Sequence, residues 1–375
     1  MTEADLYVGC ITGTSVDALD LALINVAADG EVDIVAAESA PISFELRRQL
    51  LALGQAENDN IDRLGACDRA LGHATADAIQ AFLAKSGYDA TDIRAIGSHG
   101  QTVRHRPPGT TEDPFTLQIG DPNIIAEQTN ITTVADFRRR DMAAGGHGAP
   151  LVPRFHAALF SSKVPDACVI NIGGISNVSL LGAQLRGFDT GPGNGLLDQW
   201  CDKHLSEAYD KEGVWAAGGK VNEILLDILL ADQFFSRPPP KSTGREYFNL
   251  AWLEQCAEGK NLSLAAAQDI QATLSQLTAT SIARALQNWG GNLSALIICG
   301  GGRHNTDLMS RLRHAALMLS DAPHTIEPSE HWGVDGDAIE AAAFAWFAHR
   351  RLHHLPGNVA GVTGARGERV LGAIF

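Results

Sequence analysis

Three glycine-rich turns, each after a short apolar run, are the segments of this sequence best suited to chemistry. They are G-T-S-V-D from Gly13, N-I-G-G-I-S-N from Asn171 and C-G-G-G-R-H-N from Cys299. Glycine lets backbone N–H groups approach an anion without a Cβ in the way, and successive N–H groups form a nest for phosphate oxygens. Three such turns predict that two lobes close on one nucleotide, and phosphoryl transfer is the leading hypothesis.

The first and third turns differ in their surroundings. The first, Gly13 to Asp20, lies between two predicted strands, whereas a P-loop carries a lysine and opens a helix. The hydroxyl groups of this turn could hold phosphate oxygens, and Asp17 or Asp20 could face a hydrated metal ion. Alternatively, the segment is an ordinary hairpin turn. The third, Gly300 to Gly302, precedes a predicted helix at 306–317, which suits a ribose or adenine contact and equally suits tight packing.

Asp189, in the string G-F-D-T-G-P-G-N, is the best catalytic candidate. We expect it to end an apolar strand and to enter a loop that no hydrophobic pattern explains. In a cleft, such a carboxylate can take a proton from a hydroxyl or a water, which is the role of a phosphoryl-transfer base. Alternatively, Asp189 hydrogen-bonds its own turn before Gly191 and Pro192.

Polar residues after a strand and at a helix start are further candidates. His99 and Gln101 follow a predicted strand and could bind a polar ligand, although a lone histidine is more often simply hydrogen-bonded. Glu340 lies three residues after Asp337, which is a helix-capping pattern, so both residues could be structural.

One charged run and one polar segment complete the set of candidates. The run D-F-R-R-R-D from Asp136 contains Arg138, and arginine suits a substrate carboxylate, with a surface salt-bridge cluster as the alternative. The segment 241–249, after three prolines, receives no role from its sequence.

The composition excludes several classes of protein. A formal charge of −15 argues against a nucleic-acid binder, because binding phosphates needs clustered Lys and Arg. The six cysteines show no metal or disulfide spacing, which favours a reducing cytoplasm. The acidic N-terminus lacks an apolar signal core, and no apolar stretch approaches the length of a membrane span.

Apolar periodicity predicts two related α/β lobes, residues 1–135 and 136–375. In each, three short strands come first and strands then alternate with helices, with the glycine-rich stretch 143–150 as the crossing. The segment 357–375 could pack back on either lobe. The expected strands are 7–11, 19–26, 32–37, 93–97, 131–135, 167–172, 178–181, 184–188 and 296–299, and the clearest helices are 64–82, 124–128, 270–286, 306–317 and 337–352.

A set of strings spread over nearly the whole chain resembles the anhydro-N-acetylmuramic acid kinase family. The wider actin, sugar-kinase and heat-shock chaperone ATPase superfamily shares the expected layout but not these strings. They are G-T-S-V-D-A-L-D, G-S-H-G-Q-T-V-R-H, L-Q-I-G-D, D-F-R-R-R-D, G-A-P-L-V-P, N-I-G-G-I-S-N, F-D-T-G-P-G-N, P-K-S-T-G-R-E-Y-F-N, C-G-G-G-R-H-N and V-T-G-A.

This resemblance implies a two-lobed α/β enzyme of the actin-like, sugar-kinase (ribonuclease H-like) fold, with ATP and substrate in a cleft between the lobes. It implies a cytoplasmic, typically dimeric enzyme of bacterial cell-wall recycling. Such enzymes use ATP, Mg²⁺ and water to convert 1,6-anhydro-N-acetylmuramic acid into N-acetylmuramic acid 6-phosphate.

Residue by residue, the resemblance matches Asp189 to the aspartate that activates the attacking water, and leaves the direct metal ligands unassigned. It also matches Gly13 to Asp20 and Gly300 to Gly302 to ATP contacts, and Arg138 and Glu340 to the sugar pocket. The full set of expected ATP contacts is Gly13, Thr14, Ser15, Val16, Asp17, Ala18, Leu19, Asp20, Gly173, Gly174, Gly300, Gly301, Gly302 and Asn305, and the expected sugar contacts are His99, Gln101, Asp136, Arg138 and Glu340.

The sequence departs from the family pattern at three places. Ile11 and Thr12 precede Gly13 where the family has M-S, Ala18 stands where it has glycine, and His147 replaces a glutamine. Two alternatives stay open: another sugar or carboxylate kinase of the superfamily, and a nucleotide-driven module such as a chaperone or filament subunit.

Overall fold

The computed structural model describes residues 5–13, 16–54, 60–245, 247–258, 266–319, 323 and 325–375. The chain divides into two units by its internal contacts. Unit 1 is Met1–Leu159 with Asp337–Phe375, and unit 2 is Phe160–Gly336. Thr14 and Ser15, two of the expected ATP contacts, lie outside the described residues.

Unit 1 is built on a six-stranded mixed sheet in the order β13-β7-β4-β1-β2-β3. The first three strands are consecutive and antiparallel, β4 and β7 run parallel to β1, and β13 pairs antiparallel with β7. The strands are β1 (Asp5–Thr12), β2 (Ala18–Val26), β3 (Val32–Pro41), β4 (Ile93–Ser98), β7 (Thr133–Ala135) and β13 (Ala373–Ile374), beside a separate hairpin of β5 (Gln101–Arg106) and β6 (Phe115–Ile119).

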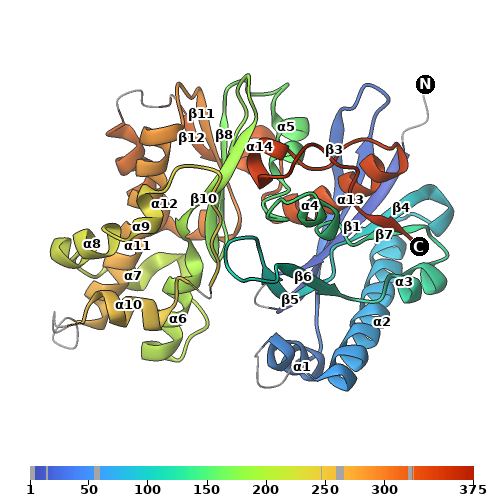
Figure 1. The fold of residues 1–375 in the computed structure, drawn as a ribbon, viewed down its shortest axis with the longest axis horizontal. Helices are drawn as coiled ribbons and strands as arrows, with labels where there is room; N and C mark the ends of the chain where they lie inside the picture. The colour runs from blue at the N-terminus through green and yellow to red at the C-terminus, as the bar shows by residue number, and fades with distance from the viewer. Residues whose placement is uncertain are drawn as a thin grey trace. The chain divides into compact units, whose positions relative to one another are not determined.

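Helices cover both faces of this sheet (Figure 1). Successive side chains of a strand point to opposite faces, so Val8 and Cys10 of β1 pack in one cluster with Ile79 of α2. Gly9 faces α13 instead, and a Cβ at Gly9 would overlap the Ala341 carbonyl oxygen. The helices of unit 1 are α1 (Phe44–Gly54), α2 (Ile61–Ser86), α3 (Pro122–Thr129), α4 (Arg139–Ala143), α5 (Pro153–Phe160), α13 (Ile339–Leu352) and α14 (Ala360–Thr363), with the 3-10 turn η2 (Ala90–Asp92).

Unit 2 repeats this topology with five strands in the order β10-β9-β8-β11-β12. Three consecutive antiparallel strands come first, and two strands parallel to β8 complete the sheet. The strands are β8 (Cys168–Ile172), β9 (Ile175–Leu180), β10 (Arg186–Pro192), β11 (Ala295–Cys299) and β12 (Thr325–Pro328). The shared strand order confirms the predicted class of two related α/β lobes, and the sheet of each lobe is mixed.

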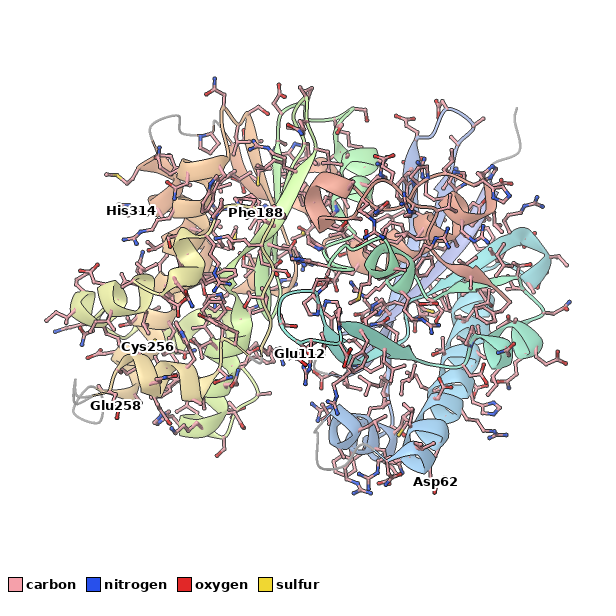
Figure 2. All side chains as sticks on the ribbon, viewed as in Figure 1. Asp62, Glu112, Phe188, Cys256, Glu258 and His314 are labelled. Carbon is pink, nitrogen blue, oxygen red and sulfur yellow. The ribbon has the colours of Figure 1, made fainter. Side chains whose placement is uncertain are left out.

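The core of unit 2 forms between this sheet and its helices. Phe188 of β10 lies among the buried side chains and meets Trp289 of α11 edge to face, with ring centroids 5.7 Å apart (Figure 2). The helices are α6 (Asn194–Leu205), α7 (Val214–Ala217), α8 (Glu223–Leu230), α9 (Gln233–Ser236), α10 (Leu250–Cys256), α11 (Ala267–Trp289) and α12 (Thr306–Leu317), with η3 (Lys211–Gly213), η5 (Gly301–His304) and η6 (Ser329–Trp332).

The units differ in extent from the predicted lobes 1–135 and 136–375. Residues 136–159 and 337–375 lie in unit 1, because α13 packs on β1 and β4 and because β13 pairs with β7. The glycine-rich stretch 143–150 is held inside unit 1, where the His147 N–H donates to the Thr363 carbonyl. Among the helices of the described ranges, none is long and apolar enough to span a bilayer.

Candidate active site

Asp189 is buried within strand β10, with 8% of its surface exposed. The expectation that the strand ends at Asp189 was wrong, because pairing with β9 carries β10 on to Pro192 past a register shift between Asp189 and Gly191. The Asp189 N–H donates to the Lys241 carbonyl at 3.1 Å, and its Oδ2 accepts from the Thr243 N–H at 2.8 Å. The Asp189 carboxylate is therefore held by the segment 241–249, for which the sequence alone indicated no function.

Lys241 brings a positive charge into the interior beside Asp189. The side chain is 6% exposed, its Nζ donates to the Phe234 carbonyl at 3.1 Å, and it lies 4.6 Å from the ring centroids of both Phe234 and Trp289. Burial lowers the pKa of Lys241 to about 8, and the charge of Asp189 opposes that shift. Because this electrostatic interaction is mutual, the Lys241 charge favours an ionised Asp189, as a general base requires.

A polar row crosses the sheet of unit 2 at the level of Asp189. Asp189 pairs with Asn177 of β9, and Asn177 pairs with Asn171 at the end of β8. Directly opposed residues of antiparallel strands project from the same face, so the row leads from the carboxylate to the second glycine turn. The Oδ1 of Asn177 is buried and makes no hydrogen bond within the described residues, which leaves an acceptor for a ligand.

The second and third glycine turns meet at the carboxyl ends of β8 and β11, which are parallel neighbours. This edge is where open α/β sheets bind ligands. Gly300 has a φ of +76°, and a Cβ there would press on Asn171 and Ile172. Gly301 is exposed, with open space around its missing Cβ out to Asn194 at 3.7 Å.

Arg245 lies against the second turn and was not predicted as a site residue. A Cβ on Gly174 would come within 2.6 Å of its Nε, and that Nε is buried without a hydrogen-bond partner in the described part of the chain. A buried donor without a partner beside a glycine turn suits an anionic ligand. Asp198 of α6 is a second unpredicted candidate, because burial raises its pKa to about 7 although Arg245 opposes the rise.

Asn305 has a structural role in addition to its predicted contact with ATP. It is the N-cap of α12, and its Oδ1 accepts from the Leu308 N–H at 2.9 Å. The backbone that precedes it, the turn η5, connects β11 to this helix.

In unit 1, the half-buried Arg138 contacts the buried His99. The Nε of Arg138 donates to His99 Nε2 at 3.0 Å, and Nη1 of Arg138 donates to the Gly148 carbonyl at 2.8 Å. Because His99 Nδ1 lies 2.8 Å from the Gly100 carbonyl, Nδ1 carries the proton and Nε2 accepts. Burial and the charge of Arg138 hold the pKa of His99 well below its usual value, so the ring is neutral.

Glu340 belongs to the same group. Burial lowers the pKa of Arg138 to about 10, against the attraction of Glu340 and Asp141. The N-cap of α13 is Ala338 and not Asp337, and an alanine side chain cannot cap the helix. Gln101 is also buried, and none of the residues that the structure describes makes a hydrogen bond to its Oε1.

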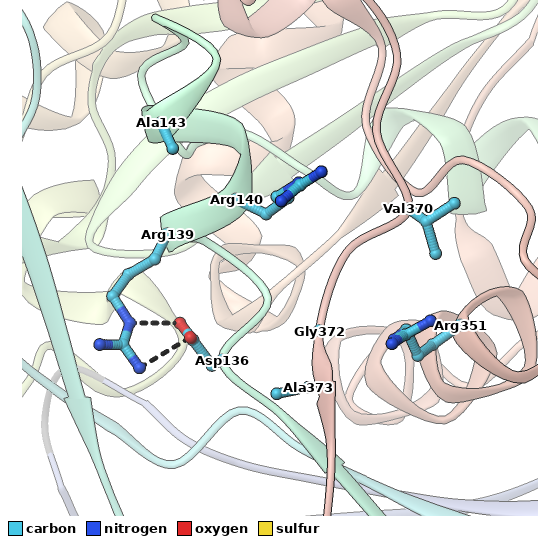
Figure 3. Close-up of a pocket in the computed structure, with 8 residues that line it drawn as sticks. All are labelled: Asp136, Arg139, Arg140, Ala143, Arg351, Val370, Gly372 and Ala373. Atoms are coloured by element: carbon cyan, nitrogen blue, oxygen red, sulfur yellow. Dashed lines mark hydrogen bonds and ion pairs between the residues drawn. The ribbon is translucent and has the colours of Figure 1, made fainter.

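Asp136 contacts Arg139 and not the group of His99, Arg138 and Glu340. Its carboxylate binds Arg139 at two points, Nε to Oδ1 and Nη2 to Oδ2, both at 2.7 Å. The two residues face a different cavity, which Arg138 does not line (Figure 3).

Asp17 and Asp20, the two aspartates of the first glycine turn that could face a metal ion, have different surroundings. Asp17 makes an exposed ion pair with Arg47 at 2.6 Å, whereas Asp20 is half-buried and accepts from Ser39 at 2.8 Å. Burial, and further the charge of Asp337, raise the pKa of Asp20. Val16 and Leu19 pack in the apolar cluster of unit 1, so their side chains do not face a ligand, and Ala18 begins β2.

Comparisons with known proteins agree on one family. The family model described as anhydro-N-acetylmuramic acid kinase matches residues 5–375. Relatives carrying that name include a Vibrio cholerae protein, 46% identical over 100% of this chain and 99% of its own, and a Xylella fastidiosa protein, 48% identical over 99% and 96%. A Coxiella burnetii relative is 46% identical over 98% of this chain and 97% of its own.

The solved structures that match this chain are more distant in sequence. A ROK family glucokinase from Streptomyces griseus, in complex with glucose and AMPPNP, is 14% identical, covers 92% of this chain and 99% of its own, and has a TM-score of 0.39. An activator of 2-hydroxyisocaproyl-CoA dehydratase from Clostridium difficile, with bound ADPNP, is 13% identical over 92% and 97%, with a TM-score of 0.42.

Proposed function

The chain belongs to the anhydro-N-acetylmuramic acid kinase family, and we propose that it uses ATP and water to convert 1,6-anhydro-N-acetylmuramic acid into N-acetylmuramic acid 6-phosphate. One observation carries the assignment of its base. The buried Asp189 carboxylate accepts from the Thr243 N–H, lies beside the Lys241 charge and shares a sheet row with the second glycine turn.

In the proposed reaction, Asp189 takes a proton from a water whose oxygen attacks the anomeric carbon. The bond from that carbon to O6 breaks, O6 attacks the γ-phosphorus of ATP, and ADP leaves with the electrons of the broken P–O bond. The Thr243 N–H fixes one carboxylate oxygen so that the other faces the water, and general-base assistance contributes roughly 10²–10⁴ in rate. The proton leaves Asp189 for solvent after the transfer.

In this proposal, backbone N–H groups of the glycine turns and the Arg245 side chain bind ATP. The turns are Gly13 to Asp20, Gly173 with Gly174, and Gly300 to Gly302, with Asn305 closing the last. His99, Arg138 and Glu340 are proposed to bind the sugar, because a buried neutral imidazole, a half-buried guanidinium and an exposed carboxylate interact with one another in unit 1.

Asp20 and Asp337 fit a hydrated Mg²⁺. Each raises the cost of ionising the other, and a divalent cation between them would reverse that effect. When bound, Mg²⁺ neutralises charge on the transferring phosphates. We also propose a cytoplasmic homodimer on the family resemblance alone, and light scattering of the purified protein tests the dimer.

The test of Asp189 is its conversion to asparagine, which keeps the shape and removes the base. We expect Asp189→Asn to abolish turnover while ATP affinity stays nearly unchanged, and Asp202→Asn, on the exposed face of α6, to behave as wild type. A variant that retained a tenth of the activity would remove Asp189 from the base role.

Isotope labelling tests the reaction itself. In ¹⁸O-water, the proposed reaction puts the label on C1 of the product and none on the phosphate. A substrate panel tests the two alternatives. Faster turnover of N-acetylglucosamine or acetate than of the anhydro sugar would indicate another kinase, and ATP hydrolysis at a rate independent of the anhydro sugar would indicate a nucleotide-driven module.

A further inference from the structure

We propose that a second cavity in unit 1, formed by α4, the last turn of α13 and the segment before β13, binds a small phosphate ester or inorganic phosphate. Its volume is about 590 Å³. Arg139 and Arg140 line it from α4, Arg351 from α13 and Gly372 from the C-terminal segment (Figure 3). A cavity of this size accommodates a ligand as large as a phosphorylated monosaccharide.

The charges in this cavity are not balanced. Among the described residues that line it, the acidic one is Asp136, and Arg139 already binds its carboxylate at two points. In the part of the chain that the structure describes, the Arg140 and Arg351 guanidinium groups make no ion pair and no hydrogen bond, and the Nε of Arg351 is buried without a partner. Two unpaired cations facing one cavity are unexpected in a chain of formal charge −15.

The two guanidinium groups reach the cavity from different helices, α4 and α13 (Figure 3). Arginine presents planar pairs of N–H donors that match phosphate oxygens two at a time. A phosphate monoester has three terminal oxygens and carries up to two negative charges, so it can accept from both groups at once. A carboxylate has two oxygens and one charge and satisfies one fork only.

Hydrogen bonds of a buried aspartate fix the position of α4, which forms one wall of the cavity. Asp141 of α4 is fully buried, and its Oδ1 accepts from Asn358 at 2.6 Å and from Thr363 at 2.7 Å. Its Oδ2 accepts from the Gly148 N–H at 2.8 Å. These bonds hold α4 in place, so Arg140 projects from a rigid base and less entropy is lost when an anion binds.

This cavity is separate from the group of His99, Arg138 and Glu340 that is proposed to bind the sugar. Arg138 precedes α4 but points to His99 and Gly148, and none of His99, Arg138 and Glu340 lines the cavity. The inference does not depend on the proposed function, since it rests on contacts that the proposed reaction does not use.

Calorimetric titration of the full-length protein with inorganic phosphate tests the proposal, with the nucleotide site filled by a non-hydrolysable ATP analogue. We expect one site per chain. Affinity should fall by about tenfold or more in the double variant Arg140→Gln/Arg351→Gln and partly in Arg140→Lys/Arg351→Lys, which keeps the charges and loses the forks. Arg48→Gln, on the exposed face of α1 and paired with Glu45, is the control that leaves binding unchanged.

Further titrants identify the chemistry of the ligand. Glucose 6-phosphate that binds at least as tightly as phosphate, with glucose inert, indicates a phosphate ester, whereas tighter inorganic phosphate indicates the free ion. The proposal is overturned if no heat is seen up to about 10 mM phosphate, if the double variant binds as wild type while its thermal unfolding is normal, or if acetate binds as well. Displacement by the anhydro sugar would place the anion in the sugar site and overturn it too.

Discussion

The charge of Lys241 is the residue-scale feature with the clearest kinetic consequence. Asp189 raises the pKa of Lys241 against burial, and the coupling works in both directions, so the ammonium favours the ionised carboxylate. We predict that Lys241→Met shifts the acidic limb of the kcat–pH profile to higher pH by about one unit. Initial rates at saturating ATP and sugar, from pH 5 upward, measure this shift.

Lys241→Arg keeps the positive charge and is the matched control. Its acidic limb should stay at the wild-type position even if its maximal rate falls, because the electrostatic effect on Asp189 remains. Coincident acidic limbs in wild type and both variants would contradict a role for the Lys241 charge.

The burial of His156 predicts that unit 1 loses stability in acid. Its side chain is 1% exposed, and burial alone lowers its pKa to about 3. Between that value and about 6.5, the unfolded chain binds a proton that the folded chain does not, so stability is lost as pH falls from 6.5 towards 3. From pH 6.5 to 5 this residue alone removes about 2 kcal/mol.

Urea unfolding at pH 7.5, 6.5 and 5.0 checks this value against His156→Gln, which cannot titrate. The variant should lose about 2 kcal/mol less than wild type between pH 6.5 and 5. The buried His99 also resists protonation and contributes equally in both proteins, so the difference isolates His156. An equal loss in the two proteins would show that His156 takes up a proton without unfolding.

At the scale of elements, the contact between α13 and the sheet leaves no space for side chains. A Cβ on Gly97 of β4 would overlap the Phe344 carbonyl oxygen of α13, and neither backbone can move alone. We predict that Gly97→Ala destabilises the protein by about 3 kcal/mol or more, measured as the shift in urea midpoint. Gly65→Ala, on an exposed turn of α2 with nothing within 4 Å, should instead stabilise it by about 0.5–1 kcal/mol.

The elements that the sequence predicts well are those whose apolar pattern reflects burial. Strand β8 is buried at all five positions, and its apolar run predicted it. The hairpin strand β5 was not predicted, because Q-T-V-R-H-R contains no apolar alternation and five of its six residues are only partly buried. The end of β10 was missed for a related reason: D-T-G-P has no strand pattern, and the strand exists there because β9 pairs with it.

The candidate site shows the same division between local and long-range information. Glycine turns after strands and the aspartate of F-D-T-G-P-G-N are visible in the sequence. The Thr243 N–H that holds Asp189 is a backbone donor 54 positions away, and no residue type marks it. Arg245 could have been noticed as a cation in a polar segment, but its place against Gly174 depends on the fold of unit 2.

At the scale of the whole molecule, unit 1 is made from two separate stretches of chain. The sequence indicates a strong helix over 337–352, but periodicity does not say which sheet that helix covers. Packing decides it: α13 supplies Ala341, Phe344 and Ala345 against the backbones of β1 and β4, and the edge strand β13 follows it. The predicted boundary at residue 135 placed this helix in the other lobe.

This arrangement predicts different behaviour for fragments of the chain. Residues 160–336 are continuous and carry their own apolar clusters, so we expect them to fold alone with a cooperative thermal transition. Residues 1–159 lack α13, so one face of β1, β2 and β4 would be exposed, and we expect no cooperative transition and no near-ultraviolet circular dichroism. Joining residues 1–159 to 337–375 through a glycine–serine linker should restore both signals, because it returns the covering helix. If residues 1–159 alone melted at the midpoint of the joined protein, α13 would not be the element that completes the core of unit 1.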